Sequence, residues 1–189
     1  GDKQIIKDAS CRIPMGSKVA VIGENGSGKS TFLKTLAGLY QCQDKKVLDF
    51  GLKVAYIPAD ELLFQGHTVL DNISYSKSNL AFDSIKKQLY KLQFDDAESM
   101  CGKIPAQLSS GEAKRINIAR GLSCDAQIIL VDEPTSCLDK ENACYVMEEL
   151  FRLEGRTVIY ITHDPVYINM ADEIILVHNG QIRMIDKKE

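Results

Sequence analysis

Three short apolar runs constrain the fold of this chain more than any other feature. Residues 18–22, 128–131 and 157–161 consist almost entirely of β-branched and aliphatic side chains, without alternation of polar and apolar positions. Strands that are covered on both faces of a parallel sheet have this composition. Turn-forming residues follow each run. Further strand-like runs occupy residues 52–57, 173–177 and 181–185.

Helical patterns alternate with these runs. Apolar side chains recur at helical spacing in residues 29–39, 84–94, 109–122 and 140–153. Strands that alternate with helices predict an α/β fold, with a mostly parallel sheet and flanking helices. Residues 60–107 carry helix signals and no convincing strand, which indicates a helical subdomain inserted into the sheet.

Composition excludes several classes of protein. The chain has 189 residues, 44% of them hydrophobic and 26% charged, which is typical of one globular domain. Its formal net charge of -3 disfavours a broad nucleic-acid surface, so no nucleic-acid partner is expected. No run of 18 apolar residues is present, so no segment of this sequence is expected to span a bilayer. The six cysteines contain no C-x-x-C pair and are interpreted as thiols in a reducing setting.

A phosphate-binding pattern follows the first strand. Residues 23–30 read GENGSGKS and match G-x-x-x-x-G-K-[ST] between a strand and a helix. Glycines let the backbone turn its N–H groups toward phosphate oxygens, and Lys29 adds a positive charge. The hydroxyl of Ser30 is available to Mg²⁺, and the helix N-terminus favours an anion. The pattern predicts that the chain binds a nucleoside triphosphate.

Two adjacent carboxylates end the strand at 128–131. Asp132 and Glu133 lie where open α/β sheets place their ligands, at the carboxyl end of a buried strand. Asp132 is predicted to hold Mg²⁺ through its water shell. Glu133 is predicted to polarise an attacking water beside the γ-phosphate.

Three further segments resemble those of one family. Residues 108–112 read LSSGE and are similar to the Leu-Ser-Gly-Gly-Gln signature of ATP-binding cassette (ABC) ATPases, with Ser110 in place of a glycine and Glu112 in place of glutamine. Residues 136–139 resemble the D-loop of that family, and residues 162–164 its switch-histidine loop. Because order and spacing also agree, the resemblance covers almost the whole chain.

The resemblance implies a P-loop NTPase fold of the RecA-like kind, with a core of about 1–59 and 123–189 and a helical subdomain of about 60–122. It implies that Lys29, Glu133 and His163 are catalytic and that Ser30 and Asp132 bind the metal. It also implies that two such domains face each other, so that Ser109 and Gly111 grip the γ-phosphate bound by the other copy while Asp139 couples the two sites. The predicted ATP-binding residues are Gly23, Asn25, Gly26, Ser27, Gly28, Lys29, Ser30, Thr31, Ser109, Gly111 and Asp139.

The chain departs from the family pattern in three places. Ala59 stands where the family has a glutamine after the strand at 52–57, and Asp60 or Gln65 would have to replace it. No stacking aromatic for adenine precedes the strand expected at 10–13, so the chain is interpreted as an excised fragment. The stretch between Gly38 and Lys53 is short, so the antiparallel β part of the fold is expected to be trimmed.

The predicted function is ATP hydrolysis that powers transport across a membrane, with ATP and Mg²⁺ as cofactors. Expected partners are a second nucleotide-binding domain and a transmembrane domain fused upstream, at the cytoplasmic face of the membrane. Residues 60–73 resemble the corresponding stretch of exporter-type cassettes. The alternatives are a soluble ABC ATPase acting in DNA repair, on ribosomes or in iron–sulfur assembly, and a regulator that binds nucleotide but hydrolyses it poorly.

Overall fold

A computed structural model of the chain describes residues 5–7, 9–40, 51–75 and 80–185. Its contacts define two compact units. The sheet unit contains Gly1–Tyr56, Ala126–Glu133 and Glu154–Glu189, and the helical unit contains Ile57–Asp125 and Pro134–Leu153. The sequence assigned residues 134–153 to the core. In the structure they belong to the helical unit, where Glu149 pairs with Lys91 at 3.3 Å.

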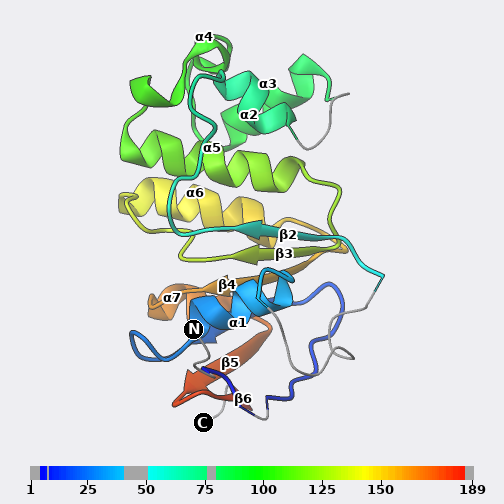
Figure 1. The fold of residues 1–189 in the computed structure, drawn as a ribbon. Coiled ribbons are helices and arrows are strands. Elements are labelled where there is room, and N and C mark those ends of the chain that lie inside the picture. Colours follow the sequence, from blue (N-terminus) through cyan, green and yellow to red (C-terminus); the bar gives the residue numbers. More distant parts are fainter. Residues whose placement is uncertain (1–4, 8, 41–50, 76–79, 186–189) are drawn as a thin grey trace. The chain divides into compact units, whose positions relative to one another are not determined.

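The sheet is six-stranded, in the order β2-β3-β4-β1-β5-β6 (Figure 1). β1 pairs in parallel with β4 and β5, β3 pairs in parallel with β4, and β5 pairs with β6 in antiparallel fashion. The mostly parallel α/β architecture is therefore confirmed. The strands are β1 (Lys18–Ile22), β2 (Val54–Ile57), β3 (Ile128–Val131), β4 (Thr157–Ile161), β5 (Glu173–His178) and β6 (Gln181–Ile185).

The prediction of a strand at residues 10–13 is wrong, because residues 9–14 have no regular structure. The expectation of a trimmed antiparallel part depends largely on residues 41–50, which lie outside the described ranges. Within the described residues the antiparallel pairing is that of β5 with β6.

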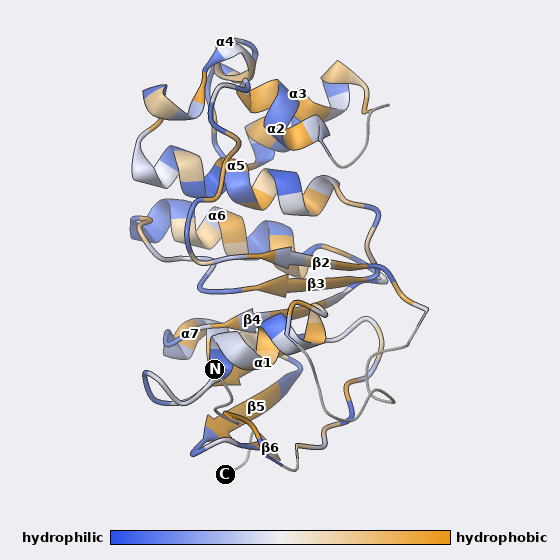
Figure 2. Cartoon of the chain, in the orientation of Figure 1, coloured by the Kyte–Doolittle hydropathy of each residue, from blue (hydrophilic) through white to orange (hydrophobic). Residues whose placement is uncertain are grey.

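The apolar runs form the core of the sheet unit. All five residues of β4 are buried, as are four of the five in β1. Figure 2 shows hydrophobic colouring along β3 and β5. Helix α1 (Lys29–Leu36) packs on β4 and contributes Phe32 and Leu33 to the same core. Each such side chain contributes about 1.5–3 kcal/mol by leaving water, so this core holds the strand ends in fixed register. Helix α7 (Pro165–Met170) follows β4.

The helical unit lacks strands in residues 60–75 and 80–107. Helices α2 and α5 pack together, as do α3 and α4. Among the described residues, no helix combines the length and apolar character needed to cross a membrane. The helices are α2 (Val69–Ser74), α3 (Phe82–Lys91), α4 (Ala97–Gly102), α5 (Ser110–Ser123) and α6 (Lys140–Phe151), with a 3₁₀ turn at Pro105–Gln107.

Candidate functional site

The topology of the sheet gathers three predicted segments at one edge. Strands β3, β4 and β1 are neighbours and run parallel, with Val131 opposite Tyr160 and Val21 opposite Ile161. The phosphate-binding loop of residues 23–30, called the cradle from here on, follows β1. Asp132 and Glu133 follow β3, and His163 follows β4. Because parallel strands in register end at the same edge, these segments lie on the side where open α/β sheets bind their ligands.

Glycines give the cradle its shape. Gly23 has φ of 145°, and a Cβ there would collide with the carbonyl oxygen of Val177. Gly28 adopts the left-handed conformation with φ of 107°, directly before α1. Few other residues tolerate these conformations, so the path of the loop depends on glycine at both positions. Asn25 and Gly26 lie exposed on the same loop.

Lys29 is folded back over the cradle. Its ammonium group donates hydrogen bonds of 2.9 Å to the carbonyl oxygens of Gly23 and Glu24. The side chain is only 7% exposed, and burial lowers the pKa of Lys29, while the charges of Glu133 and Asp132 act in the opposite direction. The cation and both carboxylates therefore belong to one electrostatic cluster.

The N-terminus of α1 is open. No side chain caps it, and the first intrahelical bond runs from the N–H of Phe32 to the oxygen of Gly28. The N–H groups in the first turn of a helix need partners from outside it, and a phosphate is a suitable one. Ser30 and Thr31 lie half-buried in this turn. Within the described residues, the buried Oγ of Ser27 has no hydrogen-bond partner.

The two carboxylates after β3 occupy different environments. Asp132 is 4% exposed and accepts a hydrogen bond of 3.1 Å from the hydroxyl of Tyr56 on β2. Glu133 is half-buried and has φ of 49°, unusual for a residue other than glycine. Sequence reasoning missed Tyr56. The available signal was a hydroxyl-bearing side chain inside an otherwise apolar strand.

The oxygen atoms of Ser30 and Asp132 are suitable ligands for Mg²⁺. The hydroxyl of Ser30 and the carboxylate of Asp132 are hard oxygen ligands, and both follow strands that end at the same edge of the sheet. Mg²⁺ typically takes one or two protein oxygens, substrate phosphate oxygens and water. Ser30 and Asp132 would hold it in this way.

His163 lies exposed on the loop between β4 and α7. This loop is held on both sides of the histidine. The N–H of Asp164 donates to the hydroxyl of Thr162 at 3.1 Å, and the carboxylate of Asp164 accepts from the N–H of Val166 at 2.8 Å. The backbone position of His163 is therefore fixed while its ring remains accessible.

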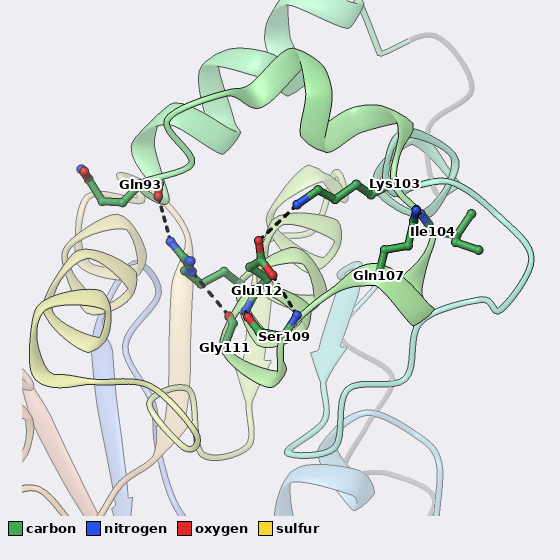
Figure 3. Close-up of polar contacts among 8 residues, drawn as sticks. Gln93, Lys103, Ile104, Gln107, Ser109, Gly111 and Glu112 are labelled. Atoms are coloured by element: carbon green, nitrogen blue, oxygen red, sulfur yellow. Dashed lines mark hydrogen bonds and ion pairs between the residues drawn. The ribbon is translucent and has the colours of Figure 1, made fainter.

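The signature residues belong to the helical unit. Ser109 caps α5, and Gly111 lies in its first turn (Figure 3). A Cβ on Gly111 would lie 3.6 Å from the carbonyl oxygen of Cys137, so the D-loop runs beside this helix end. Asp139 caps α6 by accepting a 2.8 Å hydrogen bond from the N–H of Asn142, which lowers the pKa of Asp139.

The segment around Ala59 is held through its backbone. The ammonium group of Lys114, on α5, donates a 2.7 Å hydrogen bond to the carbonyl oxygen of Ala59, and Asn117 donates to that of Pro58 at 3.3 Å. Lys114 is fully buried. Sequence reasoning missed this contact, although a lysine among the apolar positions of a predicted helix was visible. The replacement of the family glutamine by Asp60 or Gln65 stays a prediction.

Comparison with known proteins adds the family. A profile described as ABC transporter matches residues 6–136. The macrolide export ATP-binding/permease protein MacB of Neisseria gonorrhoeae is 34% identical, over 94% of this chain and 31% of its own length. The sulfate/thiosulfate import ATP-binding protein CysA of Mesostigma viride is 30% identical, over 100% of this chain and 59% of its own length.

A solved structure agrees. The ATP-binding cassette MJ0796, in a dimeric post-hydrolysis state bound to ADP and Pi, superposes with a TM-score of 0.82 at 25% identity, over 96% of this chain and 90% of that one. The chain thus spans most of that cassette, but less than two thirds of each of the two longer relatives. The chain belongs to the ABC transporter family, as an ABC ATPase domain.

Proposed function

We propose that this chain binds ATP and Mg²⁺ at the edge of its sheet, and that ATP closes it against a second nucleotide-binding domain to power transport. The observation that carries the proposal is the convergence of the cradle, the two carboxylates and the switch-histidine loop at the ends of three neighbouring parallel strands. The uncapped helix end and the cation of Lys29 suit the phosphates.

In the proposed reaction, Glu133 orients a water molecule for attack on the γ-phosphorus. The water oxygen forms the new P–O bond, the bond to the ADP oxygen breaks, and ADP, phosphate and a proton are released. Mg²⁺ supplies charge neutralisation for the phosphate oxygens when bound by Ser30 and Asp132. Lys29 and His163 stabilise the charge that develops on the γ-phosphoryl group, which is the main contribution of proteins to this chemistry.

The second domain completes the site. Ser109 and Gly111 of one copy donate hydrogen bonds to the γ-phosphate bound by the other copy, and Asp139 couples the two sites. The dimeric state of MJ0796 supports this proposal. In this chain, the N-terminus of α5 offers the Ser109 hydroxyl and the N–H groups of the first turn, which favour anions.

We further propose that the chain works in export, as the cytoplasmic part of a protein whose transmembrane domain is fused upstream. The similarity to MacB, named as an export ATP-binding/permease protein, supports export. The similarity to CysA, named as an import protein, is the reason to test the direction of transport. The gene sequence upstream of Gly1 distinguishes this proposal from a soluble ABC ATPase. Six hydrophobic spans are expected there.

The dimer is tested with Glu133→Gln. Glutamine keeps the size and hydrogen-bonding reach of Glu133 but removes the charge that polarises water. Hydrolysis should fall steeply while the phosphate contacts remain. We expect this variant to dimerise with Mg²⁺-ATP and to stay monomeric with ADP, as measured by size-exclusion chromatography with light scattering.

The matched control adds Ser109→Arg, which puts a bulky side chain where the γ-phosphate of the other copy docks. This double variant should remain monomeric in ATP. A monomeric Glu133→Gln variant at saturating ATP, or a double variant that still dimerises, would show that the assignment of the signature residues is wrong.

A further inference from the structure

The signature helix of this chain begins with an ion pair. We propose that Lys103 is a positioning residue for the signature segment, because its pairing with Glu112 cancels the charge of a carboxylate held against the Ser109 backbone. This inference rests on the proposed function. It extends that function to a residue outside the signature motif.

Glu112 and Ser109 bind each other reciprocally. The N–H of Ser109 donates to a carboxylate oxygen of Glu112 at 2.8 Å, and the N–H of Glu112 donates to the hydroxyl oxygen of Ser109 at 3.2 Å (Figure 3). This arrangement is a capping box. The Ser109 oxygen acts as an acceptor, so its hydroxyl proton remains available for a phosphate oxygen. Glu112 thereby fixes the orientation of the hydroxyl group proposed to bind ATP.

The carboxylate has an electrostatic cost at this place. The hydrogen bond from the Ser109 backbone, with further help from Lys103, lowers the pKa of Glu112, so that the group is ionised at neutral pH. A negative charge one hydrogen bond from Ser109 repels the γ-phosphate that Ser109 is proposed to accept. A glutamine, which the family signature has at this position, would make the same cap without a charge.

Lys103 supplies the compensating charge. Its ammonium group lies 3.5 Å from the second carboxylate oxygen of Glu112, with side-chain exposures of 34% and 24% for Lys103 and Glu112. The position of Lys103 is set by its backbone. Its N–H donates to Met100 at the end of α4, and its carbonyl oxygen accepts from Val69 at the start of α2.

A short segment of the chain connects Lys103 to the signature residues 108–112. The 3₁₀ turn Pro105–Gln107 lies between them, and the side chain of Gln107 accepts a 2.9 Å hydrogen bond from the N–H of Ile104. A second cation approaches from within α5, where Arg115 donates to the carbonyl oxygen of Gly111 at 3.4 Å. Arg115 also donates to the carbonyl oxygens of Leu92 and Gln93, so its hydrogen bonds go to backbone groups, and Lys103 is the cation that pairs directly with Glu112.

The test measures ATP-driven dimerisation in the Glu133→Gln parent. Lys103→Met removes the direct ion pair of Glu112, and we expect dimerisation about ten- to thirtyfold weaker, because like charges at short range interact appreciably in a partly buried site. Combining Lys103→Met with Glu112→Gln should restore dimerisation to near the parent value. Lys103→Arg, which keeps the charge, should dimerise like the parent. Raising salt toward 1 M should shrink the Lys103→Met defect.

Lys87→Met is the matched control, since it removes an exposed lysine of α3 and should not weaken dimerisation. A Lys103→Met defect that persists in the presence of Glu112→Gln, or no defect at all, overturns the inference and leaves the proposed function standing. A parent that stays monomeric in ATP overturns the proposed function, and the inference with it. Thermal unfolding of each variant distinguishes loss of fold from loss of dimerisation, and Lys103→Gln, which also removes the charge, replaces Lys103→Met if that variant does not fold.

Discussion

The N-termini of α1 and α5 are both proposed to hold phosphate, but they are built in different ways. α1 follows a glycine in the left-handed conformation and has no side-chain cap, so its N–H groups are left open. α5 begins with a capping box in which Ser109 and Glu112 satisfy each other. The first helix end depends on backbone conformation. The second depends on side chains and their charges.

The difference predicts how each helix end fails. A backbone-built cradle is set by the register of β1 and by glycines with positive φ, of which Gly23 admits no Cβ, so a small substitution there should disturb the fold itself. A side-chain-built cap has neighbours that can adjust, and its electrostatics respond to salt and pH. Substitutions at α5 should therefore alter association more than folding.

The largest expected effect comes from Gly23→Ala compared with Gly111→Ala. Alanine at position 23 would bring Cβ against the backbone of Val177 at φ of 145°, so we expect a loss of about 2–4 kcal/mol in the free energy of unfolding. Alanine at position 111 meets ordinary contacts at 3.6 Å, so we expect a change within about 1 kcal/mol.

Urea unfolding of the two variants beside the unmodified chain makes this measurement. Gly155→Ala controls for a positive φ without a steric clash, because Gly155 has φ of 69° and nothing within 4 Å of its Cβ position. A loss at Gly111 equal to that at Gly23 would break the contrast between the two helix ends.

A smaller effect is expected from Lys29→Ala. This substitution removes the cradle cation, and loss of a charge-assisted phosphate contact costs about 1.5–3 kcal/mol, or ten- to a hundredfold in affinity. Titration calorimetry with Mg²⁺-ATP measures the change. The matched substitution in the helical unit, Lys103→Ala, should leave the ATP affinity of the monomer unchanged. Unchanged affinity in Lys29→Ala would show that the phosphates bind elsewhere.

The sequence predicted best where one pattern determines both local and global structure. Strands at 18–22 and 181–185 agree with the structure to the residue, because continuous apolar runs and the turn at Asn179–Gly180 leave few alternatives. Helix α1 was expected to reach residue 39 but ends at Leu36, with Gly38 in the left-handed conformation. The strand expected at 10–13 was wrong, because a short run such as SCRI forms a strand only when a neighbour pairs with it.

The candidate site shows the same division. The cradle could be predicted because glycine spacing encodes a backbone path. The roles of Tyr56 and Lys114 could not, because each depends on a tertiary neighbour, Asp132 for the tyrosine and the carbonyl oxygen of Ala59 for the lysine. The pairing of Lys103 with Glu112 across 9 residues also depends on how α4 ends, which no local pattern states.

The smallest expected effect concerns the pH dependence of the α5 cap. The Ser109 backbone N–H lowers the pKa of Glu112 below its ordinary value of 4.5, so the folded chain binds this proton less readily than the unfolded chain. The stabilisation by the ionised cap is then fully present above about pH 4.5 and is lost as the pH falls through the lower folded pKa.

Glu112→Gln keeps the cap neutral at every pH, and the unmodified chain with its ionised cap should exceed this variant in the free energy of unfolding by about 0.3–1 kcal/mol at pH 7. This margin should shrink as the pH falls below 4.5, as measured by urea unfolding at pH 7 and at pH 3. The N-terminus of α1 has no acidic residue in its first turn, so no such pH dependence is expected from a carboxylate there. A margin that stays constant from pH 7 to pH 3 would mean that Glu112 caps α5 by shape alone, and that charge does not distinguish the two helix ends.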